Sequence, residues 1–183
     1  MMTTRILLFF SITIFAFITH ASAQQRDHLT QQEVDLVKEA QILDKRIDVF
    51  IKATERRMMV INNSAAANAK LLKKDSERWG ELPTGSRAEL VSDIAKILDE
   101  AITNIDDVSA RDERNPLIAK SLRKLAQSVN SIMAQLKPLA AQAKSDAEIA
   151  SFELLNEDAQ SILEAANKLP AEVVTDKKAK KSN

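Results

Sequence analysis

The sequence predicts an all-α protein, an antiparallel up-down helical bundle of four to five helices whose long first helix is broken or bent. Three observations lead to this fold class. Apolar residues recur at steps of three and four over most of the chain, which is the period of an amphipathic helix. With only 2 glycines in 183 residues and few aromatic side chains, the core must be aliphatic and helical. Ser or Thr precedes Glu by three positions in capping boxes at Thr30, Ser86 and Ser145.

The N-terminus predicts a secretory signal peptide over residues 1–23. A basic residue is followed by an apolar run over 6–18 and then by the small residues of a cleavage site. The run is shorter than the roughly 20 residues that a membrane span needs, so we expect no stable membrane insertion after cleavage. We expect a periplasmic or secreted protein in which residues 24–170 form a single helical-bundle domain and 171–183 a charged disordered tail.

Acidic and basic residues balance in this chain. The full sequence has 26 Lys and Arg against 26 Asp and Glu, and the leader contains only Arg5 among them, so the mature chain carries 25 against 26. This balance gives no field that would attract a polyanion, and we expect no nucleic-acid binding. Cysteine is absent, which excludes disulfides and a lipid-modified cysteine.

The first helical segment covers residues 30–80 and begins at Thr30. Asn and Ser at 62–64 compete for backbone hydrogen bonds and favour a break there. Residues 56–80 alone match the length of the next helix, which leaves the apolar stripe of 30–55 without a predicted partner. We expect either a break at 62–64 that returns the first part to the bundle, or pairing of the stripe with a second copy in a homodimer.

Three further helices follow, over residues 87–108, 116–139 and 146–169. The first begins after Ser86, the second at Asn115 with proline in the first helical position, and the third after Ser145. Pro138 is expected to kink the second of them or to end it a turn early.

The spacing of apolar positions also predicts which helices face each other. In an antiparallel pair, apolar positions should meet layer by layer. This criterion pairs 87–108 with 116–139, and 116–139 with 146–169. It also pairs 87–108 with residues 56–80, with Ile94 opposite Leu72.

The usual catalytic and metal-binding groups are missing from the predicted mature chain. It has neither Cys nor Tyr, and its only His is His28. We therefore expect no enzyme activity and no cofactor. The best candidate for chemistry is the stripe of Asp93, Glu100 and Asp107, but without a Glu-x-x-His pair it is interpreted as a solvated helix flank. Met58, Met59 and Met133 are interpreted as core filler or as an adaptable binding surface.

Residues 79–85, WGELPTG, contain the only Trp of the chain and both of its glycines. The glycines and the proline predict a corner between two helices, because they end one helix and let the chain turn. A turn does not require an indole, so Trp79 and Leu82 are the candidate site residues. We expect them either to cover the open end of the bundle beside Leu90 or Leu139, or to stay exposed as an anchor for a partner protein.

Two resemblances bear on function. The segment WGELPTGSRAELVSDIAKILDEAITNIDDV (79–108), preceded by ILDKRIDVFIKATERR (42–57), resembles an uncharacterised family of exported all-helical proteins from environmental bacteria. This likeness spans roughly residues 30–169 and implies export and a helical architecture. The element LTQQE (29–33) is similar to the L-T-x-x-Q element of periplasmic Spy-type chaperones, with Glu33 in place of the Gln.

The sequence thus predicts an exported helical binding or scaffold protein without a catalytic centre, whose protein partner is unknown. One alternative is a chaperone-like or stress protein of the cell envelope, which requires a concave apolar surface. Another is a carboxylate metal-binding bundle, which requires acidic side chains clustered in the interior.

Overall fold

The computed structural model describes residues 27–170, which form six α-helices and no strand. The helices are α1 (Gln31–Glu39), α2 (Leu43–Ile61), α3 (Ala69–Trp79), α4 (Arg87–Arg111), α5 (Pro116–Ala140) and α6 (Asp146–Asn167). The predicted all-α bundle is confirmed, although the described chain has six helices in place of the expected four to five. The predicted signal peptide and the predicted charged tail lie outside the described residues.

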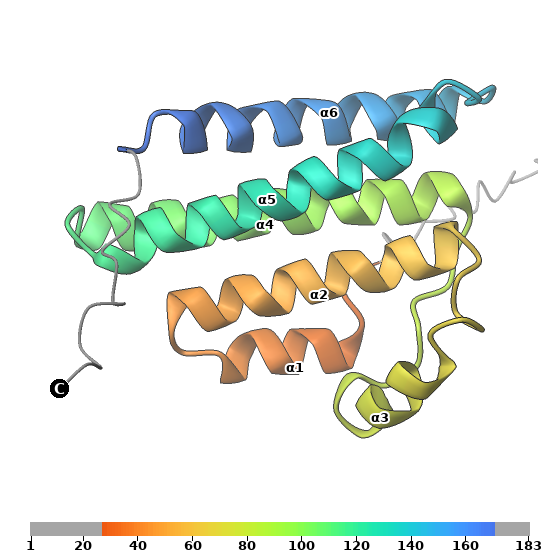
Figure 1. The fold of residues 1–183 in the computed structure, drawn as a ribbon, viewed down its shortest axis with the longest axis horizontal. Coiled ribbons are helices and arrows are strands. Elements are labelled where there is room, and N and C mark those ends of the chain that lie inside the picture. The colour runs from red at the N-terminus through yellow and green to blue at the C-terminus, as the bar shows by residue number, and fades with distance from the viewer. Residues whose placement is uncertain (1–26, 171–183) are drawn as a thin grey trace, which may run out of the picture.

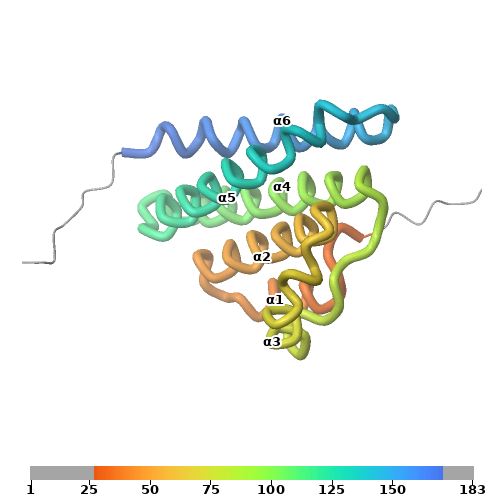
Figure 2. The backbone as a smooth tube through the Cα atoms, turned by 45° about the vertical axis from the view of Figure 1, so that its right-hand side comes forward, coloured from red at the N-terminus to blue at the C-terminus, as the bar shows by residue number. Residues whose placement is uncertain are grey.

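Four long helices, α2, α4, α5 and α6, form the bundle. Both α4 and α5 pack against α2 on one side and against α6 on the other, so α2 and α6 lie on opposite sides of this pair (Figure 1 and Figure 2). Arg46 and Arg57 of α2 contact Asn104 and Asp93 of α4, so these two helices are antiparallel. The chain direction alternates from α2 through α4 and α5 to α6, and the predicted up-down arrangement is confirmed.

The interior of the bundle is aliphatic, as the composition predicts. Each of the four long helices contributes side chains with no exposed surface to one cluster, among them Ile47, Ile97, Leu125 and Ile162. Burial of such a side chain contributes about 1.5–3 kcal/mol relative to leaving it in water, so this cluster supplies most of the driving force for folding. Within the described residues, no helix is both long enough and apolar enough to cross a membrane.

The helix starts predicted from capping boxes are confirmed. Thr30 and Ser86 form complete capping boxes. The hydroxyl of the cap residue accepts from the backbone N–H of the glutamate three positions later, and that glutamate's side chain accepts from the backbone N–H of the cap residue. Ser145 also caps its helix by accepting from the backbone of Glu148. The Glu148 carboxylate, however, lies 2.7 Å from Arg87 of α4 instead of closing the box. A tertiary ion pair has therefore replaced half of a local motif and ties the starts of α4 and α6 together.

The expected end of α5 is only partly right. The helix starts at Pro116 and is capped by Asn115, whose side chain accepts from the backbone N–H of Leu117. It continues through Pro138 and ends at Ala140, two residues later. A proline near the C-terminal end removes one backbone donor but leaves most of the hydrogen-bonded turns in place.

The predicted break of the first segment at 62–64 is confirmed. Asn62 ends α2, and Asn63 has a φ of 50°, a left-handed conformation that a helix cannot continue. The chain breaks a second time at 40–42, where the Arg46 Nε donates to the carbonyl of Ala40 over 2.9 Å. The second break folds α1 back onto α2, so the apolar stripe of 30–55 is covered within one chain.

One predicted helix pairing is wrong, and a second is present but smaller than expected. In place of residues 56–80, α2 lies along α4, and α3 lies beside α1 outside the bundle (Figure 1). The predicted pairing of α4 with α5 is present, but these helices make a smaller contact with each other than either makes with α6. Similar apolar stripes occur on every long helix, so layer matching cannot choose among neighbours. The larger side chains of α2, including Phe50 with no exposed surface, bury more apolar area than the alanines at 65–69 could.

Candidate functional site

Three charged side chains are buried together where α1, α2 and the chain after α3 meet. Glu33, Arg56 and Arg57 are at most 1% exposed. The capping box at Thr30 places Glu33 in the first turn of α1, and its carboxylate lies 3.2 Å from the Arg56 Nε and 2.8 Å from the Arg57 Nη2. Two buried guanidinium groups thus share one carboxylate, and their other donors need acceptors elsewhere.

Arg56 binds the corner that follows α3. Its Nη2 donates to the backbone carbonyls of Trp79, Gly80 and Glu81, and its guanidinium lies 5.7 Å from the centre of the Trp79 ring. Burial lowers the pKa of Arg56, and the Glu33 carboxylate opposes this by stabilising the charged form. The corner at 79–85 is therefore held in place by a buried cation as well as by its own turn residues.

The first glycine of this corner behaves as the sequence predicts. Gly80 ends α3 with a positive φ of 64°, a backbone conformation that residues other than glycine rarely adopt. A Cβ at this position would lie 2.9 Å from the side chain of Gln32 on α1. The glycine is thus needed for the turn, whereas the exposed Gln32 side chain could move aside for a Cβ.

Arg57 connects the start of the described chain to α4. It donates to the carbonyls of His28 and Ala53, and its Nε lies 3.8 Å from the Asp93 Oδ2. Asp93 is only 4% exposed, so the interpretation of this residue as part of a solvated flank is wrong. The buried arginine explains the difference, because a carboxylate beside it recovers in ion pairing part of what it loses in hydration.

The other two members of the predicted carboxylate stripe lie apart from Asp93. Glu100 accepts from the His28 imidazole over 2.8 Å, and Asp107 is exposed. In residues 27–170, no group of three His, Asp or Glu side chains is arranged to hold a metal ion. The three carboxylates of the stripe therefore lie in three separate environments and do not form one site.

The two residues predicted as a candidate site lie on this corner. Trp79 is 9% exposed and packs in a small cluster with Leu36 of α1 and Val49 of α2. Neither Leu90 nor Leu139 belongs to this cluster, so the indole covers the side of α2 and not the end of the bundle. Leu82 is half-buried. Trp79 also lines a pocket of about 510 Å³ together with Leu36, Ile42 and Val49, so the indole is packed but borders an open surface.

An apolar groove runs between α5 and α6. It has a volume of about 740 Å³ and is lined mainly by apolar side chains of both helices, including Met133, Leu136, Ile149, Phe152 and Leu155. Ile149 is 42% exposed in it. A concave surface of this kind presents apolar area to a partner without a rearrangement of the helices.

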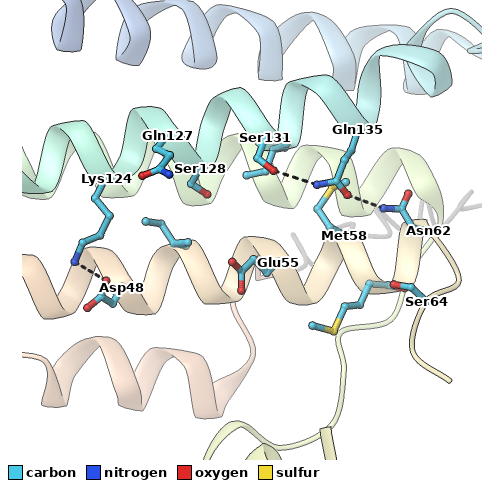
Figure 3. A pocket seen from close by; sticks show the side chains of 13 residues that line it. Asp48, Glu55, Met58, Asn62, Ser64, Lys124, Gln127, Ser128, Ser131 and Gln135 are labelled. Carbon is cyan, nitrogen blue, oxygen red and sulfur yellow. Dashed lines mark hydrogen bonds and ion pairs between the residues drawn. The ribbon is translucent and has the colours of Figure 1, made fainter. Parts of the chain in front are cut away.

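A second, more polar groove of about 480 Å³ lies on the other side of α5, between α5 and α2 (Figure 3). Met58, Met59, Ile51 and Ile132 line it together with hydroxyl, amide and charged side chains. At one end, Lys124 of α5 lies 2.6 Å from Asp48 of α2. Of the methionines that the sequence offers as core filler or as an adaptable surface, Met58 and Met59 line this groove and Met133 lines the apolar one. The grooves themselves could not be predicted, because each arises from the spacing between two packed helices.

No protein-family model matches the chain, and no curated protein or solved structure shows significant similarity to it.

Proposed function

We propose that this protein is an exported helical binding protein without a catalytic centre, and that the groove between α5 and α6 holds apolar segments of other proteins. The observation that carries the proposal is the apolar lining of this groove. Its volume of about 740 Å³ lies in the range of about 300–1,000 Å³ that ligand sites occupy. Apolar side chains that stay accessible in a concave surface lose solvent-exposed area when a partner binds, which favours the complex.

The chaperone-like alternative gains support from the composition of the same groove. Met133 lies in it with Ile149 and Phe152, and methionine adapts its shape to different partners because it is unbranched and polarizable. A rigid scaffold with one fixed partner does not need such adaptability. We therefore favour a chaperone-like protein of the cell envelope over a static scaffold.

The test uses two matched substitutions on α6. Ile149 is 42% exposed and lines the groove, whereas Leu154 is 40% exposed on the same helix and does not. Ile149→Glu places a charge in the groove, and Leu154→Glu places the same charge outside it. The measurement is light scattering of an unrelated protein diluted from denaturant, with each variant added in turn.

We expect the unchanged protein and Leu154→Glu to suppress aggregation equally, and Ile149→Glu to lose most of that activity. Equal activity of both variants would place binding outside the groove and contradict the proposal. Absence of suppression by the unchanged protein would reject the chaperone-like function. Photocrosslinking from position 149 in envelope extract, with position 154 as control, would then show whether one specific partner binds instead.

A further inference from the structure

The groove between α2 and α5 has a chemistry different from that of the apolar groove. Its walls combine thioether and aliphatic groups with carboxylate, hydroxyl and amide groups, in a volume of about 480 Å³. None of Glu33, Arg56 and Arg57 lines it, and the proposed function makes no use of it. The polar side chains of its lining show which hydrogen bonds a ligand could still make.

Both ends of this groove are closed by polar groups that bond to each other (Figure 3). At one end, Lys124 Nζ lies 2.6 Å from the Asp48 carboxylate. At the other end, the Asn62 amide donates to Gln135 over 3.2 Å, and the Gln135 amide donates to the hydroxyl of Ser131 over 3.3 Å. These groups have partners already, so a ligand gains little by binding them.

The middle of the groove differs from its ends. Glu55 of α2 and Ser128 of α5 line it between the two closed ends (Figure 3). Within residues 27–170, neither side chain has a hydrogen bond or an ion pair. A carboxylate can only accept hydrogen bonds, and a hydroxyl can accept as well. A ligand that satisfies both must therefore bring donors and, for Glu55, a positive charge.

The charge of the lining agrees with this requirement. Asp48 and Glu55 provide two negative charges and Lys124 provides one positive charge, so the groove carries a net negative charge. An anionic ligand would be repelled by Glu55, and a wholly apolar ligand would remove water from that carboxylate without replacing it. Beside the carboxylate, Met58 and Met59 supply apolar contact for a carbon chain.

From these features we infer that the α2–α5 groove is a binding site for a primary alkylammonium group. The ammonium donates to the Glu55 carboxylate and to the Ser128 hydroxyl, while its methylene chain lies against the two methionines. The same chemical group occurs in free alkylamines and at the end of lysine side chains in proteins. The charge-assisted hydrogen bond to Glu55 supplies the selectivity for a cation.

The three methionines outside the predicted signal peptide provide a direct readout. Met58 and Met59 line the α2–α5 groove, and Met133 lines the α5–α6 groove on the other side of the same helix. Carbon-13 labelling of the methionine methyl groups gives one NMR signal for each. A ligand in the proposed site shifts the signals of Met58 and Met59 and leaves that of Met133 in place as an internal control.

The experiment titrates butylammonium chloride into the labelled protein, with butanol as the neutral probe of the same length and an acetylated Gly-Lys-Gly amide as the peptide probe. We expect the ammonium compounds to shift Met58 and Met59, and butanol to have no such effect. Tighter binding of the peptide would identify a lysine side chain as the natural group, and tighter binding of butylammonium would identify a free amine. No shift with either ammonium compound would overturn the proposal.

Two substitutions complete the test. Glu55→Gln keeps the shape of an exposed side chain and removes its charge, and we expect it to weaken binding about tenfold or more. Asp106→Asn removes an exposed charge on α4 outside the groove and should leave binding unchanged. Equal weakening by both variants would show a general electrostatic effect and would overturn the assignment of the site, as would an equal shift of the Met133 signal.

Discussion

The bundle of α2, α4, α5 and α6 and the layer formed by α1 and α3 bury different kinds of side chain. In the bundle, the fully buried groups are aliphatic residues such as Leu125 and Ile162. Where α1 and α3 pack on α2, the second apolar cluster consists of Leu36, Val49 and Trp79, and the charged side chains around Glu33 are buried in the same region. The bundle is stabilised mainly by apolar burial, and the outer layer depends on a few directed ionic and hydrogen-bonded contacts.

Because of this difference, the stability of the bundle and that of the outer layer should respond differently to mutation. Apolar burial is non-directional, so the loss of one side chain from a large core leaves the other contacts in place. A buried ion cluster depends on every member, because removal of one charge leaves the others without compensation. We therefore expect the outer layer to be more sensitive to single polar substitutions than its small size suggests.

The largest effect is expected for Glu33→Ala. This substitution leaves the buried guanidinium groups of Arg56 and Arg57 without their shared carboxylate and should lower the free energy of unfolding by about 3–5 kcal/mol. Urea denaturation followed by circular dichroism measures the change. Glu39→Ala, an exposed position on the same helix, serves as control and should change stability by less than about 0.5 kcal/mol. Similar values for the two variants would show that the cluster contributes no special stability.

Truncation of the indole comes next. Trp79→Ala removes the largest side chain of the outer layer and its contact with Arg56, and should cost about 3 kcal/mol. Urea denaturation measures this loss. In the unchanged protein, the single Trp should give a blue-shifted fluorescence that acrylamide quenches poorly, because it is 9% exposed. Water-like emission together with unaltered stability of the variant would instead support the alternative of an exposed partner anchor.

A smaller effect of opposite sign, an increase in the free energy of unfolding, is expected for a substitution in the bundle. Burial raises the pKa of Asp158 on α6 to about 6, and repulsion by Asp99 and Glu157 adds to the shift. A raised pKa means that the folded state binds the proton more tightly, so stability increases as the pH falls from about 7 towards the ordinary value of 3.8. Asp158→Asn should stabilise the protein at pH 7 by about 1 kcal/mol after solvent screening.

The pH dependence provides the check on this prediction. The advantage of Asp158→Asn should disappear near pH 4, where the unchanged carboxyl group is protonated in the folded protein. Thermal unfolding at pH 7 and pH 4 measures both values. A constant advantage at both pH values would show that the charge of Asp158 is not the cause.

The smallest effect is expected for Lys124→Ala, between α2 and α5. Hydrogen bonds from Lys124 and Lys120 hold the pKa of Asp44 below its ordinary value of 3.8. Desolvation lowers the pKa of Lys124, but its bonds to Asp44 and Asp48 outweigh this and raise it. Lys124 is partly exposed, so the substitution should cost at most about 1 kcal/mol at pH 7.

The loss of stability in Lys124→Ala should depend on pH, because the folded state lowers the pKa of the Asp44 carboxyl group. The stabilising contribution should be complete above pH 4 and should vanish as the pH falls through the folded-state pKa of Asp44. Urea denaturation at pH 7 and pH 3 compares the two conditions. A loss that persists unchanged at low pH would indicate that the lysine acts through the packing of its methylene chain.

The features that could be predicted from the sequence are local. The caps at Thr30, Ser86 and Ser145, the break after Asn62 and the positive φ of Gly80 each depend on residues within a few positions of one another. Helical periodicity is local in the same sense, which is why the fold class was predictable. Trp79 and Leu82 were singled out by composition alone, and their packing could not be read from it.

The features that could not be predicted join distant positions. Glu33 contacts arginines that follow it by 23 and 24 residues, and Arg57 contacts Asp93 of a different helix. An Arg-Arg pair on a helix is usually solvated, so the sequence gives no reason to bury Arg56 and Arg57. The sequence points to Met58, Met59 and Met133 in the two grooves beside α5, but the shape of these grooves could not be predicted, because it depends on how far α2 and α6 stand from α5.

The sequence by itself determined that this protein is made of helices, where most of them begin, and which faces are apolar, because backbone hydrogen bonding and side-chain periodicity act within a few residues. Only the tertiary structure decided which helices are neighbours, that Trp79 packs against α1 and α2, and where open grooves remain. The physical reason is that aliphatic faces are interchangeable as partners. Unique contacts such as the pairing of Glu33 with two arginines exist only after the chain has brought distant positions together.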